Sequence, residues 1–173
     1  EHDQNGEEGF LNTLYYSDWA VGEFIKAASK MDWYEDTIFI FTADHCLGSF
    51  SSGSFLDKFH IPLLIFEPAK KEKKANQNVA SQLDIMPTIA GFIGYDNPFS
   101  AYGSDLRGAH KERALLNEYN TFGYVTNDGY IRDTLEQVVE SNVSETSKIE
   151  LQNQFHGHYQ LINQLLKENR WSR

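Results

Sequence analysis

The chain has 173 residues, of which 40% are hydrophobic and 23% are charged, so its composition predicts a globular protein with a core of its own. Its formal net charge of −10 at pH 7 argues against a nucleic-acid-binding groove, which needs an excess of Lys and Arg, but leaves room for an anionic substrate held through a metal ion. No apolar run is long enough to span a bilayer, and the single cysteine, Cys46, allows no internal disulfide.

The first third of the chain predicts a helix followed by two buried strands. Apolar side chains recur every three or four positions over residues 10–30, which is typical of an amphipathic helix. Residues 37–41 and 61–66 are short runs of β-branched, aromatic and aliphatic side chains. Because such runs show no polar alternation, we expect both strands to be buried on both faces of a mostly parallel sheet.

The rest of the chain predicts two more helices and an antiparallel part. Asp84 is a plausible N-cap for a helix that ends at Gly94. Residues 114–116 and 124–126 are short strand-like runs, and Asn127-Asp128-Gly129, between Thr126 and Tyr130, indicates a β-hairpin. We expect residues 140–148 to form a polar loop and residues 149–169 to form a final amphipathic helix.

The terminal helix carries two histidines, His156 and His158. They stand two positions apart, so their side chains point in different directions around a helix. We interpret both as surface residues.

The stretch that suggests chemistry is Asp44-His45, directly after the first predicted strand. In open α/β sheets, ligands bind outside the carboxyl ends of the strands. A carboxylate and an imidazole side by side can bind one divalent metal ion. The next residue, Cys46, is better explained as a small loop residue than as a third ligand, because consecutive side chains rarely converge on one ion.

Several segments together resemble a known family. In this order and spacing they are similar to the C-terminal part of a sulfatase-type domain of the alkaline phosphatase superfamily, and within it most of all to the lipoteichoic acid synthase and phosphoglycerol transferase branch. The resemblance covers about residues 11–131. The segments are Tyr16-Ser17-Asp18 with Gly22-Glu23-Phe24, Thr42-Ala43-Asp44-His45, His60-Ile61-Pro62-Leu63-Leu64-Ile65, Leu83-Asp84-Ile85-Met86-Pro87-Thr88 and Tyr102-Gly103-Ser104-Asp105-Leu106.

The resemblance implies a fold and a domain organisation. We expect an α/β fold of alkaline-phosphatase type, a three-layer sandwich with a mostly parallel sheet, plus a small antiparallel C-terminal part. Residues 1–173 would then be the C-terminal portion of one sulfatase-like catalytic domain. Its α/β core would span about residues 10–110, and the antiparallel strands and terminal helix would span about residues 111–173.

The resemblance also implies a metal-dependent attack on a phosphate or sulfate ester by a hydroxyl nucleophile, with a covalent intermediate. Asp44 and His45 match the metal-ligand pair of the transferase branch, where many sulfatases have Asp-Asn and calcium. An imidazole ligand favours manganese or zinc over calcium, and we expect manganese ahead of zinc, magnesium or calcium. We therefore expect phosphoglycerol transferase-like phospho-group transfer. The alternatives are a sulfatase or phosphodiester hydrolase, and a non-catalytic domain that kept the fold.

Two further residues are expected to bind substrate. Ser49 stands five residues after Asp44, where the synthases use a serine to contact glycerol phosphate; a chance serine in a serine-rich loop explains it equally well. His60 precedes the second strand, where relatives often carry Arg or another polar residue. The alternative for His60 is a structural histidine whose hydrogen bonds are satisfied.

The resemblance assigns no catalytic residue to this chain, since the family's nucleophile and its upstream acidic ligand would precede residue 1. We therefore expect the chain to be a piece of a longer enzyme and to be inactive alone. Its partners would be the remainder of its own catalytic domain and a phosphate- or sulfate-ester substrate, lipid-derived in the transferase case, and no nucleic acid. The parent protein is expected to be anchored in the cytoplasmic membrane with its catalytic domain on the extracytoplasmic face.

Overall fold

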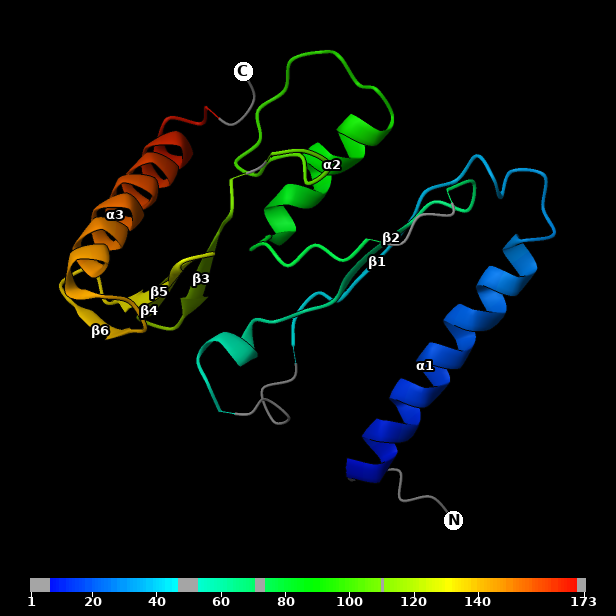
Figure 1. Ribbon diagram of the computed structural model, residues 1–173, viewed down its shortest axis with the longest axis horizontal. Coiled ribbons are helices and arrows are strands. Elements are labelled where there is room, and N and C mark those ends of the chain that lie inside the picture. Colours follow the sequence, from blue (N-terminus) through cyan, green and yellow to red (C-terminus); the bar gives the residue numbers. More distant parts are fainter. Residues whose placement is uncertain (1–6, 47–52, 71–73, 110, 171–173) are drawn as a thin grey trace. The chain divides into compact units, whose positions relative to one another are not determined.

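The computed structural model describes residues 7–46, 53–70, 74–109 and 111–170. The chain divides into two compact units, Glu1–Lys74 and Ala75–Arg173, which we call the first unit and the second unit (Figure 1). None of the helices in the described ranges has the length and apolar character required to cross a bilayer. Each unit is described by itself below.

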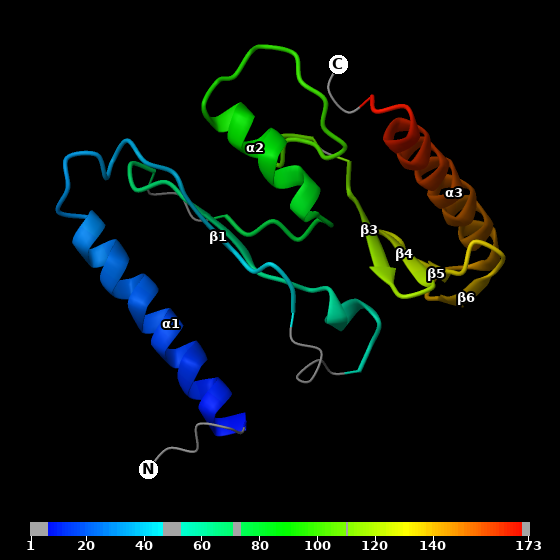
Figure 2. The ribbon, with the colours of Figure 1, turned by 180° about the vertical axis from the view of Figure 1, so that it is seen from behind.

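The first unit contains one long helix and one pair of strands. Helix α1 spans Glu7–Ala28, strand β1 spans Phe39–Thr42 and strand β2 spans Leu63–Phe66. The expected helix and both expected strands are therefore present, with ends shifted by at most three residues. The two strands run side by side in both ribbon views (Figures 1 and 2).

The direction of this strand pair corrects one expectation. Strands β1 and β2 are antiparallel, with Phe39 opposite Phe66 and Thr42 opposite Leu63, whereas we expected parallel neighbours. A parallel pair needs a crossover connection, which is usually an α-helix. The described residues between β1 and β2 form only the short 3-10 turn Leu56–Lys58. An apolar run indicates burial, but it does not specify the direction of the neighbouring strand.

An aromatic cluster holds β1 in place within the first unit. Phe39 is only 8% exposed, and its ring centroid lies 5.7 Å from that of Tyr34, 5.9 Å from Phe66, 6.0 Å from Phe24 and 6.4 Å from Trp33. These partners come from α1, from the turn after it and from β2. Centroid separations in this range are those of favourable tilted, stacked and edge-to-face pairs. The cluster thus fixes the start of β1 and, through it, where the strand ends.

The second unit begins with a short helical region and continues as an antiparallel meander covered by a helix. Its four strands follow one another in space in the order β3-β4-β5-β6, and all neighbours are antiparallel. This confirms the expected antiparallel C-terminal part. The elements are the 3-10 turn η3 (Gln82–Asp84), α2 (Ile85–Phe92), β3 (Arg113–Glu118), β4 (Thr121–Thr126), β5 (Gly129–Asp133), β6 (Val138–Ser141) and α3 (Glu145–Lys167).

The expected hairpin forms between β4 and β5. Thr126 pairs with Gly129, so Asn127 and Asp128 make a two-residue turn, which is the preferred length for an antiparallel connection. Gly129 has a φ of 142°, in the region where side chains are disfavoured. The hairpin signal in the sequence is confirmed.

A second expectation, that residues 140–148 form a polar loop, is also corrected. Residues expected to form a loop instead contain the end of β6 and the first turn of α3, which begins at Glu145. Ser144 is the N-cap, and its hydroxyl accepts a hydrogen bond from the Ser147 N–H at 3.3 Å. The first turn of a helix tolerates polar residues because its N–H groups need caps. Hydrophobic periodicity therefore placed the start of this helix four residues too late.

The core of the second unit lies between α3 and the meander. Tyr124, Ile131, Leu151 and Phe155 are each at most 7% exposed and pack together. Leu151 and Phe155 are one turn apart on α3, so both face the strands. Ile131 and Phe155 are almost completely buried, which makes this the most tightly enclosed apolar cluster among the described residues.

Candidate functional site

The Asp44-His45 pair lies immediately after β1, on the first unit. Strand β1 ends at Thr42, and both side chains are exposed, Asp44 to 89% and His45 to 72%. Nε2 of His45 lies 3.7 Å from Oδ2 of Asp44. The backbone N–H of His45 also donates a hydrogen bond of 3.0 Å to Oδ1 of Asp44. The structure therefore brings these two predicted residues together with their polar atoms on the same side.

A backbone contact sets the tautomer of His45. Its Nδ1 lies 2.8 Å from the carbonyl oxygen of Cys46. A carbonyl oxygen can only accept, so Nδ1 must carry the proton in this arrangement. In the neutral imidazole the lone pair is then on Nε2, the atom nearest Asp44. Metal-binding histidines commonly show this arrangement, with the other ring nitrogen donating to a carbonyl or carboxylate.

The pair has the chemistry of a partial divalent-metal site. One carboxylate and one neutral imidazole are suitable ligands for manganese or zinc. A complete protein site normally needs at least one or two more ligands. Within residues 7–46, 53–70, 74–109 and 111–170, no cluster of three or more His, Cys, Asp or Glu side chains is close enough to hold an ion. Asp44 and His45 would therefore contribute two ligands of a larger set.

The loop after the pair is tied back to the chain through Cys46. The thiol of Cys46 donates to the carbonyl oxygen of Lys58, which lies at the end of the 3-10 turn before β2. Phe55 is 3% exposed, and its ring packs against Phe59 at 5.2 Å. These contacts give Cys46 a structural role in closing the loop, in line with the interpretation that it is not a metal ligand.

The two predicted substrate-binding residues have different outcomes. Ser49 lies outside the described residues. His60 is exposed and stands three residues before the start of β2 on the first unit. An exposed position suits a ligand-binding histidine better than a buried structural one, but His60 remains a prediction.

A buried carboxylate that the sequence analysis treated only as a helix cap has a different role. Asp84 is 3% exposed, and its side chain does not cap α2. Its Oδ2 accepts from the Ser81 N–H and its Oδ1 accepts from the Ser104 N–H, both at 2.7 Å. The Thr88 hydroxyl donates to the Asp84 carbonyl oxygen at 2.6 Å and accepts from the Leu106 N–H at 3.0 Å. Two of the segments that carry the family resemblance are thus joined by hydrogen bonds.

Gly103 is required at the point where these two segments meet. A Cβ atom at Gly103 would collide with the backbone of Leu83 and Asp84. Only glycine allows two backbones to come this close. The motifs around Asp84 and Gly103 therefore stabilise a loop on the second unit, and we assign them no chemical role.

The expectation that the two histidines of α3 are surface residues is also corrected, because both are partly buried and contact other side chains. Nε2 of His156 is 3.3 Å from Oδ1 of Asp133, a carboxylate with no exposed surface. Gln152, one turn earlier on α3, donates to Oδ2 of the same carboxylate at 2.8 Å. The ring of His158 stacks on Tyr124 at 5.8 Å. Residues four apart on a helix share one face, so the spacing of Gln152 and His156 was the available signal.

Comparison with known proteins identifies the family. A family model described as Sulfatase matches residues 7–95, which is more than half of the chain and includes Asp44 and His45. The chain belongs to the sulfatase family. Its α1, β1, β2 and α2 all lie within the matched range, whereas the antiparallel meander and α3 lie beyond it.

Curated relatives and a solved structure agree with this assignment. Arylsulfatase K of Canis lupus familiaris is 31% identical over 107 residues, covering 56% of this chain and 20% of that protein. An arylsulfatase of Clostridium perfringens is 27% identical over 120 residues, covering 64% of this chain and 25% of that protein. The crystal structure of a protein in the alkaline phosphatase superfamily from Vibrio parahaemolyticus is 26% identical, with a TM-score of 0.75, over 100% of this chain and 45% of that chain.

These comparisons confirm the expected α/β fold of alkaline-phosphatase type and the expected sulfatase-type domain. The family is one of enzymes that act on sulfate or phosphate esters and typically depend on divalent metal ions. The chain spans 20% to 25% of the length of the curated relatives described above. What the whole protein does is therefore a matter for proposal.

Proposed function

We propose that this chain supplies two ligands, Asp44 and His45, to the divalent-metal site of an enzyme that cleaves sulfate esters. The observation that carries the proposal is the geometry of the pair, with Oδ2 of Asp44 and Nε2 of His45 only 3.7 Å apart at the carboxyl end of β1. The match of the sulfatase family over residues 7–95 supports the reaction class. The arylsulfatase relatives support a sulfate ester as the substrate.

In this proposal the residues of the chain prepare the site. Asp44 contributes negative charge, and His45 contributes the Nε2 lone pair, which the Cys46 carbonyl keeps available by holding the proton on Nδ1. A divalent ion held there would lower the pKa of a hydroxyl nucleophile and offset charge on the transferred group. We propose manganese as the ion, because a mixed carboxylate and imidazole set suits it better than calcium.

The second candidate is phosphoglycerol transfer at the same site. It is supported by the Asp-His pair itself and by Ser49, which stands five residues after Asp44 as in the transferase branch. The lipid substrate, a membrane anchor and an extracytoplasmic position would follow for that branch. The two candidates differ in the group transferred, so one assay on the protein that contains this chain separates them. We expect turnover of 4-nitrophenyl sulfate, whereas turnover of phosphatidylglycerol alone would favour the transferase.

We also propose that residues 1–173 act as the C-terminal portion of one catalytic domain whose nucleophile comes from other residues. None of the segments that match the family contains the nucleophile motif. The 173-residue chain alone is therefore expected to release no sulfate or phosphate from an ester. An enzyme-like rate from the purified chain would contradict this part of the proposal.

Metal binding can be measured on the chain directly. We expect Mn²⁺ titration, followed by electron paramagnetic resonance, to show weak binding that falls at least tenfold in Asp44→Ala and in His45→Ala, because each removes one of two ligands. His60→Ala is the matched control on the same unit and should bind Mn²⁺ like the unchanged chain. Unchanged metal content in the double variant Asp44→Ala, His45→Ala would instead favour a non-catalytic domain that kept the fold.

A further inference from the structure

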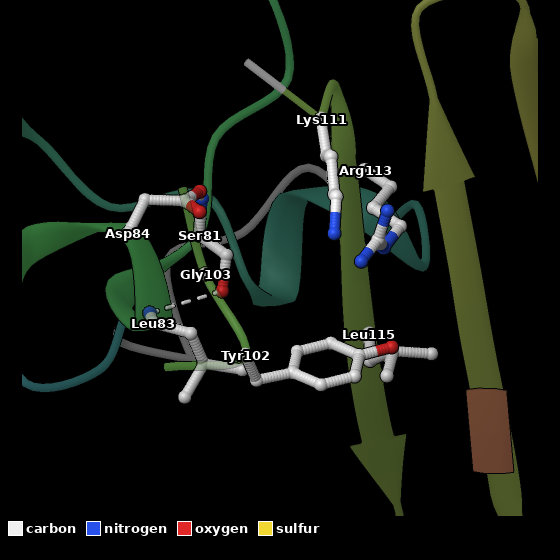
Figure 3. A pocket seen from close by; sticks show the side chains of 8 residues that line it. All are labelled: Ser81, Leu83, Asp84, Tyr102, Gly103, Lys111, Arg113 and Leu115. Atoms are coloured by element: carbon white, nitrogen blue, oxygen red, sulfur yellow. Dashed lines mark hydrogen bonds between the residues drawn. The ribbon is translucent and has the colours of Figure 1, made fainter. Parts of the chain in front are cut away.

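The second unit contains a pocket that gathers positive charge in an otherwise acidic chain. Arg113 at the start of β3 and Lys111 two residues before it line the pocket together with Tyr102 and Ser81 (Figure 3). The ring of His158 packs edge-on against Tyr102 at 5.8 Å, so a third basic side chain adjoins the pocket wall. All of these residues belong to one unit, and none of them is part of the Asp44-His45 pair.

Two polar atoms in this pocket are poorly hydrogen-bonded. The hydroxyl of Tyr102 and Nε of Arg113 are both buried and make no well-aligned hydrogen bond in the described part of the chain, although burial raises the pKa of Tyr102 while the nearby Arg113 guanidinium lowers it. The Arg113 guanidinium lies over the Tyr102 ring, 5.3 Å from its centroid. Buried polar groups are almost always hydrogen-bonded, so each unpartnered one calls for an explanation.

The acidic residue between the two cations in sequence already accepts hydrogen bonds from other side chains. Glu112 stands between Lys111 and Arg113 in sequence, but its carboxylate accepts hydrogen bonds from the side-chain amides of Asn78 and Asn127, both at 2.5 Å. Among the described residues, neither Lys111 nor Arg113 forms an ion pair with a carboxylate.

Asp84 also lines the pocket, and its charge is likewise satisfied. Its two oxygens accept hydrogen bonds from the backbone N–H groups of Ser81 and Ser104. Carboxylates bound by backbone N–H groups have less need of a further cation. The positive charge of the pocket is therefore available to an external anion.

The size of the pocket limits what it can hold. The space enclosed by the pocket is about 10 Å³, which is room for about one water molecule. Sites that enclose drug-sized molecules are larger, on the order of 300–1,000 Å³. A compact anion would therefore lie at the open mouth of the pocket, beside the exposed Lys111, and not inside it.

We propose that Lys111, Arg113 and Tyr102 form a binding site for a sulfate or phosphate group. Arg presents donors in a planar fork that matches the oxygens of such a group, and Lys adds a point charge. The exposed Lys111 ammonium and the terminal guanidinium nitrogens of Arg113 would donate to the oxygens of the group, with the Tyr102 ring packed beside the guanidinium. The site goes beyond the proposed metal-dependent reaction, and it does not depend on Asp44 or His45.

His158 gives this site a built-in reporter. Burial lowers the pKa of His158, and the charges of Arg113 and Lys111 lower it further. The other groups packed against its ring are the phenols of Tyr102 and Tyr124. An anion bound between the two cations would cancel their repulsion of a protonated imidazole. The pKa of His158 should therefore rise when the site is filled.

The experiment is a pH titration of the His158 ring by NMR on the full chain, with sodium sulfate or with sodium chloride at the same ionic strength. The expected result is a higher pKa of His158 in sulfate, together with saturable binding of sulfate in calorimetry. The ring of His156, which pairs with Asp133, serves as the internal control and should respond equally to both salts. Equal behaviour of His158 in sulfate and in chloride would overturn the proposal.

Variants test which cations are responsible. Lys111→Gln and Arg113→Gln are each expected to weaken sulfate binding at least tenfold, and Arg113→Lys should recover part of the loss. Lys148→Gln is the matched control, because Lys148 lies on the same unit but pairs with Glu145 at 2.6 Å. Since Lys111 is exposed, its variant should fold even if Arg113→Gln does not. Undiminished binding in folded Lys111→Gln would overturn the assignment.

The same titration with methyl sulfate separates a free anion from an ester group. If methyl sulfate shifts the pKa of His158 as inorganic sulfate does, the site accepts the sulfate group of an ester. If inorganic sulfate raises the pKa of His158 and methyl sulfate does not, the ligand is the free anion. If neither acts, the proposal fails whatever the outcome of the Mn²⁺ titration.

Discussion

The two units of this chain differ in what they enclose. Among the described residues of the first unit, only Ala28, Phe39 and Phe55 are buried, and the proposed metal ligands are exposed. The second unit encloses a continuous apolar core and two buried carboxylates, Asp84 and Asp133, whose oxygens are hydrogen-bonded. The family-defining match falls mainly on the first unit and the tighter packing on the second. We infer that the chemistry and the stability of this chain reside in different parts of it.

The largest expected effect tests where the stability resides. Phe155 is 1% exposed, so Phe155→Ala should lower the free energy of unfolding of the second unit by about 3–5 kcal/mol. Phe39→Ala in the first unit should cost less, because its neighbours Phe24 and Trp33 are about half exposed and water can fill the space. Urea denaturation followed by circular dichroism measures both. Equal losses, or a single shared transition, would show that the two units unfold as one.

The next effect concerns the contact between two family segments. Gly103→Ala places a methyl group against the backbone of Leu83, which cannot move aside as a side chain could. We expect a loss of about 1–3 kcal/mol in the unfolding free energy of the second unit. The thermal midpoint of the variant measures this loss. An unchanged midpoint would show that the two segments can separate without cost.

Two matched glycine-to-alanine substitutions, one in a helix of each unit, compare the stability of the two units through a smaller expected effect. Gly22 in α1 and Gly157 in α3 both have open space where a Cβ would be added. Alanine at either position should raise stability by up to about 1 kcal/mol through helix propensity. If the second unit determines the measured unfolding, Gly157→Ala should raise the midpoint and Gly22→Ala should leave it almost unchanged. The reverse order would contradict the comparison.

The smallest expected effect is a pH dependence confined to the second unit. Burial, with the charges of Arg113 and Lys111, holds the pKa of His158 below its ordinary value, so the unfolded chain binds the proton more tightly than the folded chain. The free energy of unfolding should therefore fall as the pH drops through the ordinary titration range of histidine. His158→Gln should remove this part of the slope. A slope unchanged by the substitution would assign the dependence to other groups.

Local sequence signals predicted the elements of both units well. The hydrophobic period located α1 and α3, and Asn127-Asp128-Gly129 located the β4–β5 turn. The apolar run at residues 37–41 located β1, and the placement of Asp44 and His45 directly after it is confirmed. Each of these signals works because periodicity and turn chemistry act over a few neighbouring residues.

One failure is local, the start of α3 at Glu145, and the others involve contacts between residues far apart in sequence. The antiparallel direction of β1 and β2 depends on how the chain returns between them. The use of the Asp84 carboxylate depends on Ser104, twenty positions away, and the polar contact of His156 depends on Asp133, which lies on another element. No local pattern records such partners.

The amino-acid sequence by itself determined which segments form helices, strands and turns, and it placed an aspartate and a histidine at the end of a strand. Only the tertiary structure decided that their polar atoms lie 3.7 Å apart and that Lys111 and Arg113 meet beside Tyr102. The physical reason is that backbone preferences are set by near neighbours, whereas the position of a charged side chain depends on which distant groups share its surroundings.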